Sequence, residues 1–261
     1  MEIRILGPIS IEPIGTVSTR LAPKPRKILA LLLLNANKIV STASLMTELW
    51  GETPPKSATT TLQTYVLHLR KALGALWEID LPDIAKNVLT THTNGYMLSI
   101  SPGTVDLHVY NKLVADGRRA LEEGQIERGA ARFGEALALW SGTPLADVPI
   151  GPLLEAEVMR LEEDRLGILE DRISADLRLG RHHQLLGELT SLVAQHPFHE
   201  GLHEKLMVAL HRSGRRHQAL DVYQRLRSSL VDELGIDPSP RLQRLHQSVL
   251  ASDPRLDNAA A

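Results

Sequence analysis

The chain has 261 residues and a formal net charge of −2, with no cysteine and only 3 % aromatic residues. This length allows two domains that each bury a core, and the lack of cysteine excludes disulfides, thiolate zinc sites and iron–sulfur clusters. The longest apolar run, Ile28 to Leu34, is far shorter than the roughly 20 residues that span a bilayer. We therefore expect a cytoplasmic protein that has no membrane contact.

Charge is distributed unevenly along the chain. Residues 1–104 carry 10 Lys+Arg and 7 Asp+Glu, whereas residues 105–261 carry the remaining 19 and 24. Pro102-Gly103 separates the two parts. A mildly basic first part joined to an acidic second part predicts two domains, 1–104 and 105–261, of which only the first meets a polyanion.

The segment that ends at Trp50 predicts short strands followed by two helices. Alternating apolar residues close to the N-terminus indicate a small antiparallel sheet. An apolar-rich stretch from Arg26 to Ala36 predicts a buried helix, and Ile39-Val40 predicts a strand of a single bridge. Ser41-Thr42 is expected to cap a second helix that runs from about Ala43 to Trp50.

A third helix follows the loop from Gly51 to Lys56, and Ser57 is expected to cap it. Its apolar stripe recurs at i, i+4, i+7 and i+11 and is expected to face the core: Leu62, Val66, Leu69 and Leu73. The opposite side is mainly polar and comprises Ser57, Thr60, Thr64, Leu67, His68 and Lys71, with Thr61 at its edge. We expect this helix to end at Gly74 and an irregular connection to follow as far as Lys86.

A hairpin is predicted from Val88 to Ile100, because Asn94-Gly95 favours a tight turn. A helix with one polar face followed by a short hairpin is the arrangement of a winged helix-turn-helix that reads DNA. Three consecutive threonines, Thr59 to Thr61, are poor helix formers and indicate a contact. The alternative is that this polar face only meets solvent.

The second part of the chain predicts helices throughout, over residues 106–123, 126–140, 153–179, 182–195, 198–212, 217–234 and 240–251. The segments Gly180–Leu186 and Gly214–Leu220 match at five positions, and their offset equals the tetratricopeptide period. We predict a mainly α fold with a small β component: an N-terminal winged helix-turn-helix followed by an all-α tetratricopeptide-like domain. A generic helical bundle with a chance match is the alternative.

The segment from His199 to His203 spells H-E-x-x-H, the pattern of zinc proteases. Pro197 places it at a helix start and Gly201 weakens that helix, so we expect no metal. Neither a phosphate-binding G-x-x-x-x-G-K-[ST] nor a nucleophile G-x-S-x-G occurs. We predict a protein that is not an enzyme and has no cofactor. A metalloenzyme and a tetratricopeptide-like adaptor for a peptide or small ligand are the alternative hypotheses.

With these residues in view, the chain resembles the Streptomyces antibiotic regulatory protein family, which pairs an OmpR-type winged helix with a bacterial transcriptional activator domain. The matching segments are Lys24–Lys27, Leu49–Gly51, Thr61–Val66, Leu69–Gly74, Gly95-Tyr96, Val105–Leu107, His196-Pro197 and Glu233–Pro240. Similar proteins have Arg and Trp where this chain has His199 and His203. The resemblance therefore implies that the zinc-like motif is accidental.

The resemblance also implies a function. It implies an activator of a secondary-metabolite (antibiotic) gene cluster that binds direct repeats in double-stranded DNA near promoters, as two copies side by side. Such a protein recruits RNA polymerase with its sigma factor and is associated with the nucleoid in the cytoplasm. The polymerase-contact loop is expected to comprise Gly51, Glu52, Thr53 and Lys56.

The resemblance implies two groups of DNA contacts, and the hydroxyl, amide and cationic side chains among them suit phosphates and base edges. The recognition helix is expected to use Ser57, Thr60, Thr61, Gln63, Thr64, Tyr65, His68, Arg70 and Lys71. The wing and the DNA backbone contacts are expected to use Lys24, Arg26, Lys27, His92, Thr93 and Asn94.

Overall fold

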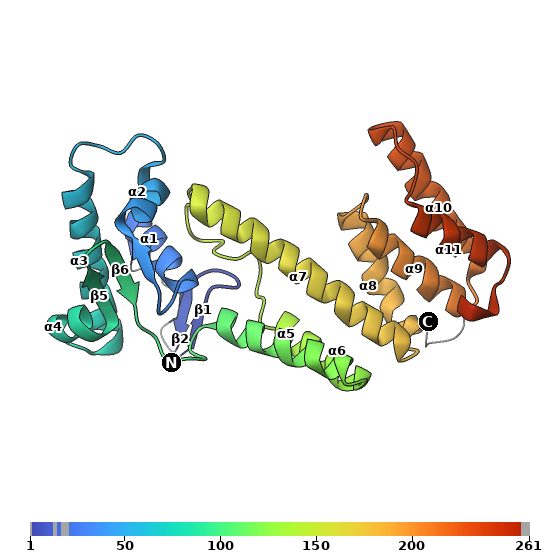
Figure 1. Ribbon diagram of the computed structural model, residues 1–261, viewed down its shortest axis with the longest axis horizontal. Coiled ribbons are helices and arrows are strands. Elements are labelled where there is room, and N and C mark those ends of the chain that lie inside the picture. Colours follow the sequence, from blue (N-terminus) through green and yellow to red (C-terminus); the bar gives the residue numbers. More distant parts are fainter. Residues whose placement is uncertain (1, 13–14, 17–20, 257–261) are drawn as a thin grey trace. The chain divides into compact units, whose positions relative to one another are not determined.

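The structure, a computed structural model, describes residues 2–12, 15–16 and 21–256 (Figure 1). The chain divides into two compact units: Met1–Val114 with Glu135–Leu166, and Ala115–Gly134 with Gly167–Ala261. The mainly helical composition with few strands confirms the predicted fold class. By compactness, residues 105–114 and 135–166 belong to the first unit. The predicted functional division at residue 104 stays a prediction.

The chain opens with a small antiparallel sheet, as predicted. Its strands are β1 (Glu2–Arg4), β2 (Ser10–Glu12) and β3 (Gly15–Thr16), in the order β1-β2-β3. Ile3 lies opposite Ile11, and both side chains are buried. The alternating apolar residues therefore place one face of this sheet in the core.

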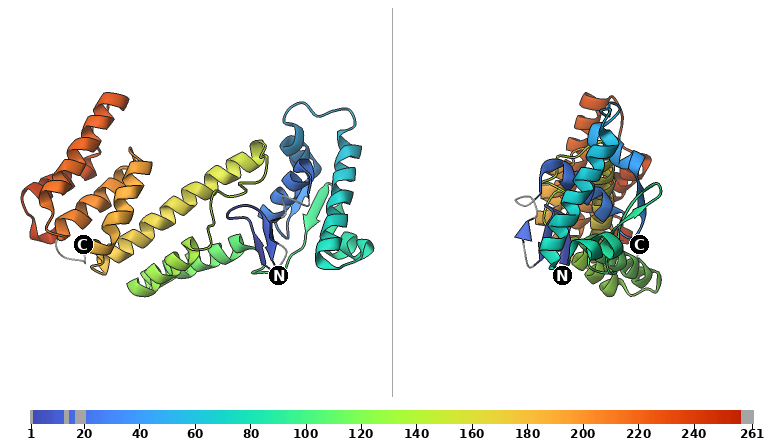
Figure 2. Two further views of the ribbon diagram at one scale, coloured as in Figure 1. Left: turned by 180° about the vertical axis from the view of Figure 1, so that it is seen from behind. Right: turned by 90° about the vertical axis from the view of Figure 1, so that its left-hand side faces the viewer.

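Three helices and a second sheet complete the winged-helix part of the first unit. The helices are α1 (Pro23–Leu34), α2 (Thr42–Trp50) and α3 (Ala58–Trp77), and each packs against the other two. The sheet order is β4-β6-β5, from β4 (Ile39–Ser41), β5 (Leu89–His92) and β6 (Gly95–Leu98). The Ser41 hydroxyl caps α2 by accepting a 2.9 Å hydrogen bond from the Ser44 N–H, as predicted. The hairpin lies beside α3 (Figure 2, right).

The end of α3 was predicted wrongly. The helix continues through Gly74 to Trp77 and ends on Glu78, which has a left-handed φ of 56°. Two short helical turns follow, α4 (Leu81–Asp83) and η2 (Ile84–Val88). A Cβ at position 74 would lie 2.8 Å from the Ile79 carbonyl oxygen. Gly74 therefore lets the chain pass close by and does not stop the helix. Ser57 precedes α3, but its side chain makes no capping hydrogen bond.

The predicted hairpin is present, with its turn one residue earlier than expected. His92 pairs with Gly95, so Thr93 and Asn94 form the turn. None of these four residues has a positive φ. A Cβ on Gly95 would lie 2.0 Å from the Val40 carbonyl oxygen. Glycine is needed here because β4 approaches so closely.

Helical hairpins make up much of the remaining chain, and identical backbone motifs close them. Their helices are α5 (Asp106–Glu122), α6 (Ile126–Leu137), α7 (Pro152–Arg178), α8 (His182–Gln195), α9 (Glu200–Arg212) and α10 (Arg216–Ser229). Gly124, Gly180 and Gly214 follow α5, α7 and α9 with φ of 75°, 75° and 72°. The next residues, Gln125, Arg181 and Arg215, donate to Ala120, Asp176 and Leu210 at 2.8, 3.0 and 2.9 Å. These are Schellman caps, in which glycine relieves the cost of positive φ. The repeated Gly-Arg thus marks the turn of each of two hairpins.

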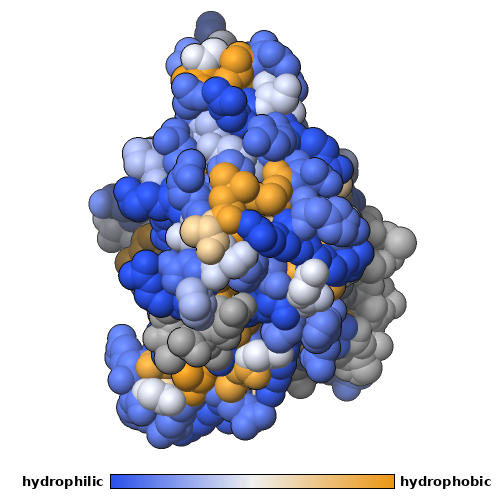
Figure 3. Space-filling view, turned by 90° about the vertical axis from the view of Figure 1, so that its right-hand side faces the viewer, coloured by the Kyte–Doolittle hydropathy of each residue, from blue (hydrophilic) through white to orange (hydrophobic). Residues whose placement is uncertain are grey.

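In the second unit α9 packs against α8, α10 and α11 (Pro240–Leu250). The turns η3 (Leu230–Leu234) and η4 (Pro254–Leu256) follow α10 and α11. Leu189, Met207, Ala219 and Val249 belong to one buried apolar cluster. The face drawn in Figure 3 is mainly hydrophilic, with small hydrophobic clusters. None of the helices within the described ranges is both long and apolar enough to cross a bilayer.

A buried carboxylate joins α2 to the start of α7 within the first unit. The Glu48 side chain is fully buried and accepts hydrogen bonds from the backbone N–H groups of Gly151, Leu153 and Leu154, the last two at 3.0 Å. A negative charge at this place stabilises the helix N-terminus, whose first N–H groups lack partners inside the helix. The Lys27 ammonium lies 3.9 Å from the same carboxylate. Glu48 therefore satisfies three amides that would otherwise be unpaired.

We predict that Glu48→Gln lowers the free energy of unfolding by about 3 kcal/mol, because a neutral amide offers one acceptor oxygen and leaves a buried N–H unpaired. Thermal and urea unfolding would measure the loss. Glu162→Gln, at an exposed position of α7, is the matched control and should stay within about 0.5 kcal/mol of the wild type. Equal stability of the two variants would contradict this role for Glu48.

Candidate nucleic-acid interface

The outward face of α3 carries most of the predicted recognition residues. Leu62, Val66, Leu69 and Leu73 are no more than 1 % exposed and fix the inward side of the helix. Exposed residues cover the other side, as expected: Thr60, Gln63, Thr64, Leu67, His68 and Lys71. Thr61 is half-buried, and Ser57 lies exposed just before the helix. The apolar stripe therefore sets which polar groups reach solvent.

The hydroxyls of this face have a defined hydrogen-bonding direction. The Thr64 hydroxyl donates to the Thr60 carbonyl oxygen at 3.0 Å, and the Thr61 hydroxyl donates to the Ser57 hydroxyl at 3.4 Å. With its proton directed back into the helix, the Thr64 oxygen offers lone pairs to an outside donor. Exocyclic amino groups of cytosine and adenine are such donors in the major groove.

A groove of about 560 Å³ lies between α3, the start of α2 and the hairpin. Its lining consists of Ser41, Thr42, Ala43, Thr59, Gln63 and the segment from Thr91 to Tyr96. No aspartate or glutamate is among these residues. His92 contributes an imidazole whose Nε2 lies 2.9 Å from the Thr90 hydroxyl. A groove rich in hydroxyls and free of carboxylates can accept the phosphate backbone of a duplex.

Sequence reasoning missed Ser41, Thr42 and Ala43 as part of this groove. They join it because β4 pairs with β6, a contact between strands that are far apart in the sequence. The only local signal is the capping role of Ser41, which indicates a helix start and says nothing about the wing.

The sequence predicted that Arg70 contacts DNA, but its guanidinium makes hydrogen bonds inside the first unit. Its Nε and Nη2 atoms donate to the Leu89 carbonyl oxygen at 2.9 and 2.7 Å, and Nη2 also donates to the Thr91 hydroxyl at 2.8 Å. Burial lowers the pKa of the guanidinium, which nevertheless stays protonated. Arg70 thus joins α3 to the hairpin, and its guanidinium is engaged within the first unit.

Tyr65 and Lys24 meet at another edge of the helix. The Tyr65 ring stacks on Trp50 with centroids 6.4 Å apart. The Lys24 ammonium lies 5.4 Å from the Trp50 centroid and 6.0 Å from that of Tyr65, in cation–π geometry. Both residues are therefore part of an aromatic cluster that joins α1, α2 and α3.

Arg26 and Lys27, the other two basic residues near the start of α1, also make hydrogen bonds within the first unit. Arg26 donates to the carbonyl oxygens of Asp147 and Leu21, and Lys27 donates to the Glu48 carbonyl oxygen at 3.3 Å. Both side chains are therefore held within the first unit, unlike the DNA backbone contacts that the sequence predicted for them.

The loop before α3 is open to solvent. Glu52, Thr53 and Lys56 are exposed. Gly51 has a φ of 62°, and a Cβ there would meet nothing within 4 Å, so its glycine serves the turn. The three polar side chains are available to a partner.

The zinc-like segment has structural contacts at each polar position. His199 accepts from the Leu202 N–H through Nδ1 at 3.3 Å, and its Nε2 lies 3.1 Å from Glu170. Glu200 accepts from the Ser239 N–H. His203 is buried with its Nδ1 3.2 Å from the His199 carbonyl oxygen. Within the described part of the chain, no three His, Asp or Glu residues are grouped to hold a metal ion.

Comparison with known proteins identifies the family. Residues 16–98 match the model described as transcriptional regulatory protein, C terminal, and residues 105–250 match the bacterial transcriptional activator domain. Regulatory protein DnrI of Streptomyces peucetius is 47 % identical over 98 % of this chain and 94 % of its own length. The chain belongs to the Streptomyces antibiotic regulatory protein family. Members of this family are transcriptional regulators and not enzymes.

Other relatives are longer than this chain. Transcriptional regulator RedD of Streptomyces coelicolor is 39 % identical over 98 % of this chain and 72 % of its own length. Regulatory protein AfsR of the same species is 38 % identical over the whole chain, which spans only 25 % of AfsR. The structure of Mycobacterium tuberculosis EmbR in complex with a low affinity phosphopeptide has a TM-score of 0.87 and 33 % identity, covering 97 % of this chain and 65 % of EmbR.

We predict that Arg70→Lys loosens the hairpin from α3, because a lysine cannot form the forked contact with Leu89 and Thr91. Hydrogen exchange of the β5 and β6 amides should become faster, and the free energy of unfolding should fall by about 1 kcal/mol. The neighbouring exposed Lys71→Ala is the control and should leave both quantities near wild-type values. Equal exchange in the two variants would mean that Arg70 does not hold the hairpin.

Proposed function

We propose that the protein is a sequence-specific DNA-binding activator of a secondary-metabolite (antibiotic) gene cluster. The observation that carries this proposal is the exposed polar face of α3 beside a carboxylate-free groove bounded by the hairpin. The major groove of B-DNA admits an α-helix, and phosphates favour a wall without negative charge. Membership of a family of transcriptional regulators supports the same reading.

In this proposal α3 lies in the major groove and presents Thr60, Thr64, His68 and Lys71 to the bases. Thr64 accepts a hydrogen bond from a base amino group, and Lys71 donates to guanine or to a phosphate. Gln63 and the hairpin tip, comprising His92, Thr93 and Asn94, approach the backbone or the minor groove. Ser57 and Thr61 contact phosphates at the start of the helix.

The proposal includes the partners that the family resemblance implies. Two copies bind side by side on direct repeats near a promoter in the cytoplasm, associated with the nucleoid. The loop residues Gly51, Glu52, Thr53 and Lys56 contact RNA polymerase or its sigma factor. Glu52, Thr53 and Lys56 are exposed before α3 and do not line the groove, which supports this role.

Footprinting on promoters of the host's biosynthetic clusters tests DNA recognition, and we expect protection of two adjacent direct repeats. The double change Thr64→Ala with Lys71→Ala should weaken binding to that operator, since each good base contact contributes about 1–3 kcal/mol. Gel-shift titration would measure the loss.

Lys86→Ala is the control for this test, since Lys86 is an exposed lysine of η2 outside the proposed face. It should bind the operator with nearly wild-type affinity. An unchanged affinity of the double variant would refute the assignment of this face, and protection independent of sequence would refute specific recognition.

We predict that Glu52→Ala combined with Lys56→Ala separates activation from DNA binding. Operator affinity should be retained because neither residue lines the groove. Transcription from the operator should fall at least about 5-fold if the pair contributes about 1 kcal/mol to a polymerase interface. In vitro transcription at a saturating concentration of activator is the measurement, and full activation by the variant would contradict the prediction.

A further inference from the structure

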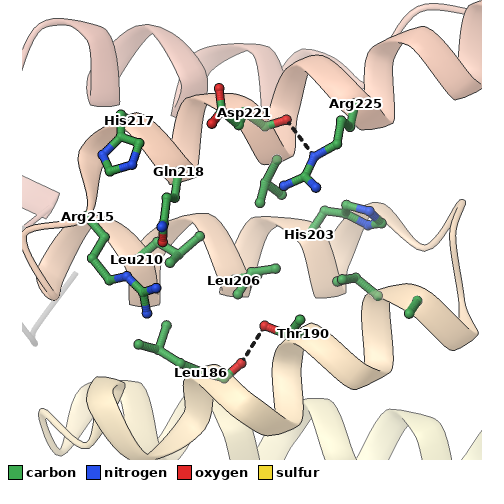
Figure 4. Close-up of a pocket in the computed structure, with 13 residues that line it drawn as sticks. Leu186, Thr190, His203, Leu206, Leu210, Arg215, His217, Gln218, Asp221 and Arg225 are labelled. Atoms are coloured by element: carbon green, nitrogen blue, oxygen red, sulfur yellow. Dashed lines mark hydrogen bonds between the residues drawn. The ribbon is translucent and has the colours of Figure 1, made fainter.

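A second groove lies within the second unit, between α8 and α10, with α9 as its floor (Figure 4). Its volume is about 620 Å³. Leu206 and Leu210 of α9 lie one turn apart on the floor, and Leu186 of α8 forms one wall. The apolar floor therefore offers a place for aliphatic side chains of a ligand.

Two arginines of this groove have no carboxylate partner among the residues that the structure describes. Within those ranges Arg215 forms no ion pair, and Arg225 donates only to the Asp221 carbonyl oxygen, at 3.3 Å. Some other arginines of the same unit do pair with carboxylates: Arg172 with Glu188, Arg181 with Asp176, and Arg241 with Glu204. In a unit with as many acidic as basic residues, two guanidinium groups that lie over leucines without a carboxylate partner favour a negatively charged occupant.

The spacing of these groups suits a short length of polypeptide. Arg215 and Arg225 are ten residues apart, which corresponds to roughly 15 Å along a helix axis. Leu206 and Leu210 lie between the two arginines along the groove, and the carboxylate of Asp221 is turned away from the α9 floor (Figure 4). Burial lowers the pKa of His203, which lies at the Arg225 end of the groove (Figure 4).

We propose that this groove binds a short peptide segment of a partner protein. The peptide carries two carboxylates, and the apolar side chains between them lie on the leucines of the groove. Arg215 and Arg225 each pair with one carboxylate, and Leu206 and Leu210 contact the apolar residues. This site is independent of the DNA contacts of α3, since none of its residues belongs to the first unit.

The test is selection of a random phage-displayed peptide library on the full-length protein, with the Arg215→Glu, Arg225→Glu double variant as the counter-selection target. We expect enriched peptides in which Asp or Glu flanks Leu, Ile, Val or Met. Failure to enrich any sequence over the double variant, or enrichment of basic sequences, would overturn the proposal.

Fluorescence polarisation with the most enriched peptide then measures each arginine separately. Arg215→Glu and Arg225→Glu should each weaken binding about 5-fold, the upper end for an exposed ion pair. Arg244→Glu changes an exposed arginine of α11 outside the groove and should leave binding unchanged. Equal weakening by all three variants would mean attraction by net charge alone and would overturn the site.

Four further readouts keep the result unambiguous. Circular dichroism and thermal unfolding should give wild-type values for all variants, because the three arginines are exposed. In sedimentation experiments, the wild-type protein should show no self-association that depends on Arg215 and Arg225. Such self-association would mean that a second copy occupies the groove, which would also overturn the proposal. Operator binding by the variants should be unchanged, which distinguishes this test from the test of DNA recognition.

Discussion

The Glu48 carboxylate holds the first unit together around α2 and the start of α7. Glu48 lies on α2, and the amides it accepts from belong to the start of α7, which is far along the sequence. A Cβ at position 151 would lie 2.3 Å from the Glu48 carbonyl oxygen, so α7 can approach α2 only with glycine there. The start of α7 is therefore held against α2 by three N–H groups directed at one buried charge. Movement of α2 would expose that charge or leave the amides unpaired.

Basic residues near α3 separate into two groups. Arg26, Lys27 and Arg70 reach carbonyl or carboxylate oxygens inside the first unit, so they hold its helices and hairpin in place. Lys71 is adjacent to Arg70 in sequence but exposed, because neighbouring residues of a helix point about 100° apart. The first unit uses Arg26, Lys27 and Arg70 internally, so these three cations are not part of the exposed face of α3.

Local sequence signals predicted the elements well where a backbone motif was involved. The Gly-Arg pairs at 180 and 214 precede α8 and α10 because glycine accepts the positive φ of a Schellman cap. The same reasoning failed at Gly74 and Gly95, which were interpreted as a helix end and a turn residue. Both lie instead where another strand or loop comes too close for a Cβ. A glycine that is needed because another segment comes close to it carries no local sequence signal. The residue that approaches it lies outside the short motif around the glycine.

The sequence by itself determined the helices, the hairpin, the apolar stripe of α3 and the family. These depend on periodicity, turn chemistry and ordered motifs, which are properties of short segments. Only the tertiary structure decided which polar groups are free. Arg70 finds its partner 19 residues away and Arg26 finds one 121 residues away. Hydrogen-bond partners and burial are set by contacts between distant segments, so no local pattern assigns them.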